Sequence, residues 1–113
     1  MINWEKFNEL FQYFDKKTIF EVIDLLIDSH EESLAKIRQC IKDRDFPAIN
    51  KSAHYLKGSV GNFHDPITTD LTLKLMEMGD NKIEEGLEET FAKLPPAVDL
   101  LIQELLEYKK KFK

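Results

Sequence analysis

The chain has 113 residues, about a third of them charged, and its formal net charge is −5 at pH 7. This length is enough for one domain with one hydrophobic core, and the acidic balance argues against a nucleic-acid-binding protein. The single cysteine, Cys40, excludes an internal disulfide and is consistent with a reducing cytoplasm, and no apolar run is long enough to span a bilayer. We therefore expect one cytoplasmic domain over residues 1–113 that contacts neither nucleic acid nor membrane.

The first 42 residues carry apolar side chains at helical spacing. The first helix is expected to begin at about Trp4 and to end near Asp15 or Lys16. Thr18 followed by Glu21 matches a capping box, so a second helix should begin there. It is expected to run to about residue 42 and to be the longest helix of the chain.

The next two helices are each introduced by an aspartate near a proline. Asp45 is expected to cap a helix that has Pro47 in its first turn and that ends near residue 62 or 63. Asp65 and Pro66 begin a fourth helix, which residues 79–81 should stop because they open with a glycine. The expected apolar face of this fourth helix consists of Ile67, Leu71, Leu75 and Met78.

The last third is helical in pattern but contains two adjacent prolines, Pro95 and Pro96. These remove backbone donors and clash with the preceding turn, so a break is expected there, with the final helix starting at about Pro96. No segment alternates with a period of two residues, so no strand is expected. The predicted fold class is all-α, an antiparallel up-and-down four-helix bundle with a short extra N-terminal helix, present as a monomer.

The segment 52–63 departs from a local rule of helix formation. Gly58 and Gly61 lie inside it, and each costs about 1 kcal/mol relative to alanine in a helix interior. Together with His54 and Lys57 they follow the spacing i, i+3, i+4, i+7, so the four residues share one stripe beside the apolar seam. A nucleophilic imidazole, an ammonium group and bare backbone on one stripe indicate a site for a phosphoryl group or another large anion.

The run Ala53-His54-Tyr55-Leu56-Lys57-Gly58-Ser59 resembles the signature of histidine-containing phosphotransfer (HPt) domains. The resemblance extends over roughly residues 15–112, and it includes segments 37–45 and 73–79. It implies a phosphorelay intermediate in which His54 accepts a phosphoryl group from a receiver-domain aspartate or a histidine kinase and passes it to the aspartate of a response regulator. In that role Lys57 would offset charge on the phosphoryl group, and Gly58 would let the partner's active site close over the imidazole.

Two positions depart from the family pattern. His64 stands where glycine is usual, and Asn62 is expected to supply the helix-ending conformation in its place. Met76 stands where many members have a Gln or Glu that hydrogen-bonds the second imidazole nitrogen, and Glu77 is one residue away from that position. The sequence therefore does not identify a residue that orients the ring of His54.

The sequence contains no Gly-rich nucleotide loop and no carboxylate cluster of the kind that holds Mg²⁺. Phosphoryl transfer depends mainly on positioning and on stabilisation of negative charge, so the Mg²⁺ is expected to come from the partner receiver domain. We expect a phosphotransfer carrier without a cofactor or metal site of its own, rather than an enzyme. The expected partners are response-regulator receiver domains and a hybrid sensor histidine kinase, and the residues expected to bind them are Lys51, Tyr55, Ser59, Gly61 and Asn62.

Two other functions stay open at this point. An HPt-like interaction module could bind a receiver without being phosphorylated, and Met76 keeps this hypothesis open. A metal-binding bundle could use His30, His54 or His64 with nearby acids, although no pair has the i, i+4 or Glu-x-x-His spacing of such sites.

Overall fold

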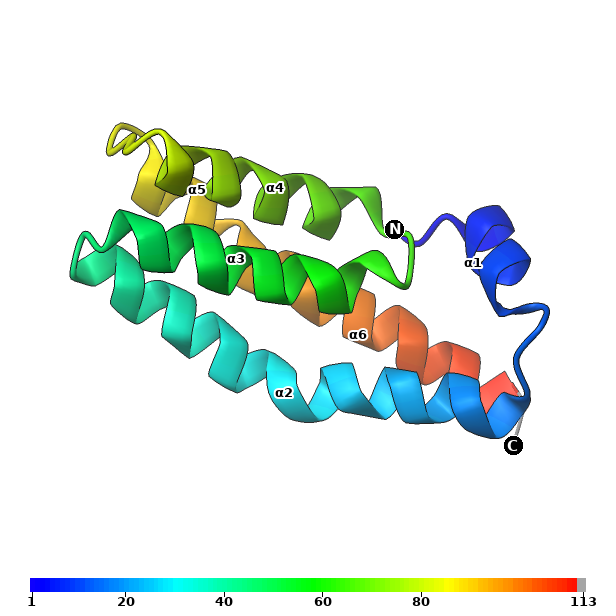
Figure 1. Cartoon of the computed structure of the whole chain (residues 1–113). Helices are drawn as coiled ribbons and strands as arrows, with labels where there is room; N and C mark the ends of the chain where they lie inside the picture. Colours follow the sequence, from blue (N-terminus) through cyan, green and yellow to red (C-terminus); the bar gives the residue numbers. More distant parts are fainter. Residues whose placement is uncertain (112–113) are drawn as a thin grey trace.

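The computed structural model describes residues 1–111, and within them the prediction of an all-helical chain is confirmed (Figure 1). Four long helices lie side by side along the 44 Å axis of the molecule, and the shortest segments lie at its two ends. The helices, in chain order, are α1 (Trp4–Phe11), α2 (Lys16–Lys42), α3 (Phe46–Gly61), α4 (Pro66–Asp80), α5 (Leu87–Ala92) and α6 (Leu94–Lys111).

The start of α2 differs from the prediction. Its N-cap is Asp15, whose carboxylate accepts a hydrogen bond of 2.8 Å from the backbone N–H of Thr18, so Thr18 already lies inside the helix. Hydrogen bonds from the side chain and the backbone of Thr18 hold the pKa of the Asp15 carboxyl below its ordinary value. The expectation that α1 reaches Asp15 is also wrong, because α1 ends at Phe11 and leaves a short turn for the chain to reverse toward α2.

The predicted cap of α3 at Asp45 and the predicted start of α4 at Asp65 and Pro66 are confirmed. The Asp45 side chain accepts a hydrogen bond of 3.2 Å from the backbone N–H of Ala48. Asp65 is buried at the start of α4, where its carboxylate accepts hydrogen bonds from the hydroxyl of Thr68 at 3.1 Å and from the amino group of Met1 at 3.1 Å. Both helices begin with a proline in the first turn, where its missing N–H leaves no partner unsatisfied.

The turn between α3 and α4 corrects the expectation about Asn62. Asn62 keeps right-handed helical angles (φ −61°), and the left-handed residue of the turn is His64 (φ +55°). The backbone carbonyl of His64 accepts a hydrogen bond of 2.8 Å from Asn3, so the N-terminal segment holds this turn. The histidine therefore takes the conformation for which a glycine is usual.

The predicted stop of α4 at residues 79–81 is confirmed, with Asn81 as the C-cap, and Gly79 lies in the last turn of the helix, against α3. A Cβ atom at this position would lie 2.7 Å from the backbone N of Asn50 and 2.8 Å from the backbone O of Phe46. The two helix backbones approach each other so closely here that only glycine fits. Helix α4 ends one residue later, at Asp80, and the left-handed residue after it is Lys82 (φ +54°).

The buried face of α4 contains two threonines that the apolar pattern did not identify. Thr68 and Thr72 are fully buried, whereas Ile67, expected on that face, is exposed. The Thr72 hydroxyl donates a hydrogen bond of 2.9 Å to the backbone O of Thr68. Burial of these hydroxyls is therefore compatible with stability, because their hydrogen-bonding groups are satisfied within the helix.

The predicted break near the two prolines is confirmed, but it lies earlier than expected. Helix α5 ends at Ala92, and α6 begins at Leu94 rather than at Pro96. Pro95 and Pro96 thus occupy the first turn of α6, where backbone N–H groups have no intrahelical acceptor in any case.

Helix α1 is attached to the end of the bundle by aromatic side chains. The ring of Phe7 is fully buried and lies with its centroid 6.4 Å from that of Phe63 and 5.0 Å from that of Tyr108. Phe63 follows the C-terminus of α3, and Tyr108 belongs to α6. Helix α1 therefore covers one end of the core and packs against the segment at which α3 ends.

Replacing Gly79 with alanine should lower the free energy of unfolding by about 1–2 kcal/mol, because overpacking against the α3 backbone outweighs the gain in helix propensity. The matched control is Gly58→Ala, which adds the same methyl group at a helical site with nothing within 4 Å of it. That variant should gain about 1 kcal/mol. Urea unfolding monitored by circular dichroism measures both, and a Gly79→Ala variant as stable as the natural protein would contradict the close approach of α3 and α4.

Replacing His64 with glycine should raise the free energy of unfolding by about 0.5–1 kcal/mol, because it removes left-handed strain at a modest cost in chain entropy. Asn62→Gly is the matched control, and it should destabilise the protein because Asn62 has right-handed helical angles. If the control were the more stable variant in the same unfolding experiment, the assignment of the left-handed position to His64 would be wrong.

Candidate functional site

The outer face of α3 carries the stripe predicted from the sequence. His54 and Gly58 are exposed, and Lys57 and Gly61 are half-buried. The opposite face of α3 is part of the core, with Ile49, Ala53, Leu56 and Val60 almost completely buried. The same helix is thus anchored along one side and open to solvent along the other, as its period of apolar residues requires.

The ring of His54 is free of intramolecular partners. Within residues 1–111 it makes no hydrogen bond and no ion pair, and the same is true of Lys57 on the next turn. An unbonded, exposed ring nitrogen keeps its lone pair accessible to an incoming electrophile. An ammonium group one turn away can interact with negative charge that arrives with that electrophile.

The fold does not require glycine at positions 58 and 61. An ideal Cβ atom at either site would have no heavy atom within 4 Å, and neither residue has a positive φ. Each glycine therefore lowers helix stability by about 1 kcal/mol, and neither is needed for a close contact or a left-handed conformation inside this chain. Such residues open space on the outer face, next to His54, for an external molecule.

On the α4 side of the site, the described part of the structure provides no polar side chain that orients the ring of His54. Met76 is partly buried and packs against the core, and its backbone O accepts a hydrogen bond of 2.9 Å from the side chain of Asn50. Glu77 is exposed. No residue of α4 hydrogen-bonds the His54 ring in the part of the chain that is described, so the ring is not held in one tautomer by a neighbour.

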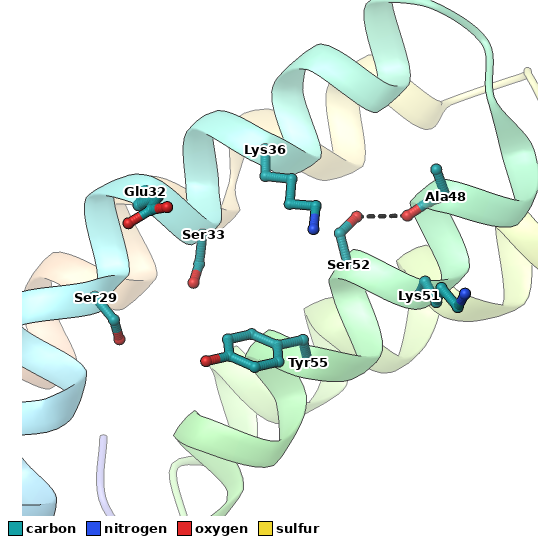
Figure 2. Close-up of a pocket in the computed structure, with 8 residues that line it drawn as sticks. All are labelled: Ser29, Glu32, Ser33, Lys36, Ala48, Lys51, Ser52 and Tyr55. Carbon is teal, nitrogen blue, oxygen red and sulfur yellow. Dashed lines mark hydrogen bonds between the residues drawn. The ribbon is translucent and has the colours of Figure 1, made fainter.

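The α2 side of the site is a groove between α2 and α3 of about 540 Å³, drawn in Figure 2. Lys51 and Tyr55, both predicted to bind a partner, line it from α3. Ser59 and Asn62 continue along the same side of α3 toward its C-terminus, half-buried and exposed respectively. The structure thus brings Lys51 and Tyr55 together in one groove, and it places Gly61 on the His54 stripe instead.

Four groove residues of α2 were not predicted as site residues from the sequence: Ser29, Glu32, Ser33 and Lys36. Ser29, Ser33 and Lys36 recur at i, i+4 and i+7, which is a polar helical stripe that a search for apolar residues does not detect. Their position opposite Lys51 and Tyr55 follows only from the pairing of α2 with α3. The polar stripe could have been found in the sequence. Only the pairing of α2 with α3 shows that this stripe lines a groove next to the predicted site.

The histidines do not form a metal centre in the described structure. Among residues 1–111 no three His, Cys, Asp or Glu side chains come close enough together to hold a metal ion. His30 instead places its Nδ1 atom 2.6 Å from the backbone O of Ile27. In the same residues, no helix combines the length and the apolar character that crossing a bilayer requires.

Comparison with known protein families gives one match. A family model of the Hpt domain matches residues 21–108, which includes α3 and most of the bundle. Curated proteins and solved structures gave no significant match. Hpt domains act in histidine phosphotransfer within phosphorelays, where they interact with receiver domains and kinases. Because the match covers well over half of the sequence, the chain belongs to the Hpt domain family.

Proposed function

We propose that the protein is a phosphorelay intermediate in which His54 carries the phosphoryl group. The supporting observation is a difference among the chain's three histidines. His54 is the only exposed one, whereas His30 and His64 are partly buried. His54 also lies beside the open backbone of Gly58, and it stands in the run that resembles the HPt signature.

In the proposed reaction, the lone pair of one nitrogen of neutral His54 attacks the phosphorus atom of a receiver aspartyl phosphate. The N–P bond forms as the P–O bond to the aspartate breaks, and the carboxylate returns to the receiver with the bonding electrons. The reverse displacement, by the aspartate of a second receiver, unloads the histidine. A neutral imidazole suits both directions, because its ordinary pKa lies near 6.5 and the N–P bond is easily broken.

The remaining requirements of the transfer are divided between the two proteins. Lys57 would interact with the equatorial oxygens of the phosphoryl group, and Gly58 would allow the partner's active site to close over the ring. The Mg²⁺ ion and most of the stabilisation of the transition state would come from the receiver. We therefore assign this chain the role of a carrier with no turnover, nucleotide site or metal site of its own.

This assignment extends to the setting in which the protein works. We infer that it acts as a cytoplasmic monomer between a hybrid sensor histidine kinase and one or more response regulators. We further interpret α2, α3, α4 and α6 as an antiparallel up-and-down four-helix bundle, with α1 as the extra N-terminal helix. In this arrangement α3 is an outer helix whose free face meets the partner.

His54→Gln should abolish phosphorylation of the protein by a phosphorylated receiver, because the glutamine side chain has no nucleophilic ring nitrogen. The label on the natural protein should be labile in acid and stable in base, as a phosphoramidate is. His64→Gln is the matched control and should keep the full label. A natural protein that binds the receiver but stays unlabelled would replace this proposal with the interaction-module hypothesis.

Gly58→Arg should leave the helical content unchanged and should slow transfer from the receiver by about 100-fold, since a displaced reacting group loses its alignment. Ala92→Arg, at an exposed position of α5, introduces the same side chain away from both the His54 stripe and the α2–α3 groove and should transfer normally. Stopped-time assays with radiolabelled receiver measure the rates. Normal transfer by Gly58→Arg would refute the requirement for close approach.

A further inference from the structure

The groove between α2 and α3 is cationic at one end although the whole chain is acidic. Lys36 lines it from α2 and Lys51 from α3, and neither forms an ion pair within residues 1–111. The net charge of the chain is −5. Two uncompensated cations on facing helices of an acidic protein form a local positive potential, and such a potential attracts a negatively charged partner group.

Lys36 is the cation that points into the groove. Figure 2 shows its ammonium group directed from α2 toward Ser52 on α3, whereas Lys51 extends away from the groove. The neighbouring side chains Ser33, Ala48 and Ser52 are small, so they leave space in front of the ammonium group. The hydroxyl of Ser52 donates to the backbone O of Ala48 at 2.6 Å, and Ser52 is therefore occupied within α3.

The groove also contains an acidic residue, Glu32, one helical turn before Lys36. Although the two stand at i and i+4, no ion pair joins them in the described structure. Glu32 makes its end of the groove unfavourable for an anion, so a partner's carboxylate would be directed to the ammonium group of Lys36. The charges of the groove therefore favour a negatively charged partner group, and they also favour one orientation of that partner along the groove.

The groove is continuous with the His54 site. Tyr55, two-thirds exposed, is the next residue after His54, and Gly58 lies one turn from both. Gly58 has no side chain and the space where a Cβ atom would stand is open, so the surface of α3 next to His54 and Tyr55 presents bare backbone there. A protein large enough to close over His54 would extend onto the groove at the same time.

We propose that the α2–α3 groove selects among receiver partners by binding an acidic side chain on the receiver surface, and that Lys36 is the specificity-determining cation. The proposal rests on the proposed function of His54 and adds to it a criterion for the choice of partner. Lys36 does not touch the reacting atoms. It is expected to act on the rate of encounter and on the affinity of docking, and not on the transfer step itself.

The test compares Lys36→Glu with Lys93→Glu in transfer from a phosphorylated receiver. The receiver is the one from the same source that loads the natural protein fastest. Lys36→Glu should lower kcat/KM by about tenfold, leave the rate at saturating receiver unchanged and weaken the dependence of kcat/KM on salt concentration. Lys93 is exposed between α5 and α6, so its variant makes the same change in net charge at a remote site and should behave as the natural protein.

A charge-reversal experiment tests whether the effect is one of specificity. Acidic residues on the receiver surface are changed to lysine one at a time, and one of these receivers should transfer better to Lys36→Glu than to the natural protein. Lys36→Gln is a milder variant, expected to lower kcat/KM about threefold, and it keeps the test valid if the charge reversal disturbs folding. An equal loss in Lys36→Glu and Lys93→Glu, or the absence of any rescuing receiver, would overturn the proposal.

Direct phosphorylation with phosphoramidate separates this proposal from the proposed function, because that reagent needs no receiver. Lys36→Glu should be labelled at the natural rate, and His54→Gln should not be labelled at all. Slow labelling of Lys36→Glu would overturn the docking role, since it would place Lys36 in the chemistry. Labelling of His54→Gln would instead refute the assignment of His54 and leave no basis for the groove proposal.

Discussion

The arrangement of this molecule depends on the contact between α3 and α4 at Gly79. At that point a single hydrogen in place of a side chain lets two helix backbones approach to a distance that a methyl group would prevent. The hydrogen bond from Asn50 to the backbone of Met76 holds the same turns together. Because α3 is fixed there and along its buried apolar seam, its outer face has a defined direction, and His54 is presented from a rigid element.

Glycine serves two different purposes in this bundle. Gly79 stabilises the fold because no other residue fits at that contact. Gly58 and Gly61 weaken their helix and contact nothing inside the chain, so their effect lies outside it. The contrast indicates that Gly79 is required for helix packing, whereas Gly58 and Gly61 leave room for a partner. A comparison of sequence patterns alone cannot make this distinction, because all three glycines interrupt helices in the same way.

The site itself is chemically sparse. It has one free imidazole, one nearby ammonium group and open backbone, and the described structure contains no group of acids that could hold a metal ion. A surface of this kind is suited to carrying a phosphoryl group between proteins that supply the other catalytic groups. In the role that we propose, the chain must also select the right partner, and the uneven charge of the α2–α3 groove is the physical means that we propose for that selection.

Local interactions made much of this predictable from the sequence. The period of apolar residues identified the helices, the aspartates and prolines located the starts of α3 and α4, and spacing placed His54, Lys57, Gly58 and Gly61 on one stripe. These features depend on residues within a few positions of each other. The predicted start of α2 at Thr18 was wrong because two residues there can cap a helix. Asp15, which comes three residues earlier, is the one that does so. The buried threonines of α4 were missed because their hydroxyls bond to the helix backbone and so behave as core residues.

The tertiary structure alone decided the features that join distant segments. The packing role of Gly79 was not visible in the sequence, because the backbone of α3 that it contacts lies about thirty residues away. His64 could adopt the left-handed conformation because its turn is held by the N-terminal segment, and Lys36 lines the groove because α2 packs beside α3. The sequence by itself determined which helix carries the histidine and on which face of that helix it lies. The pairing of the helices determined what surrounds it, because that pairing depends on core contacts between residues far apart in the chain.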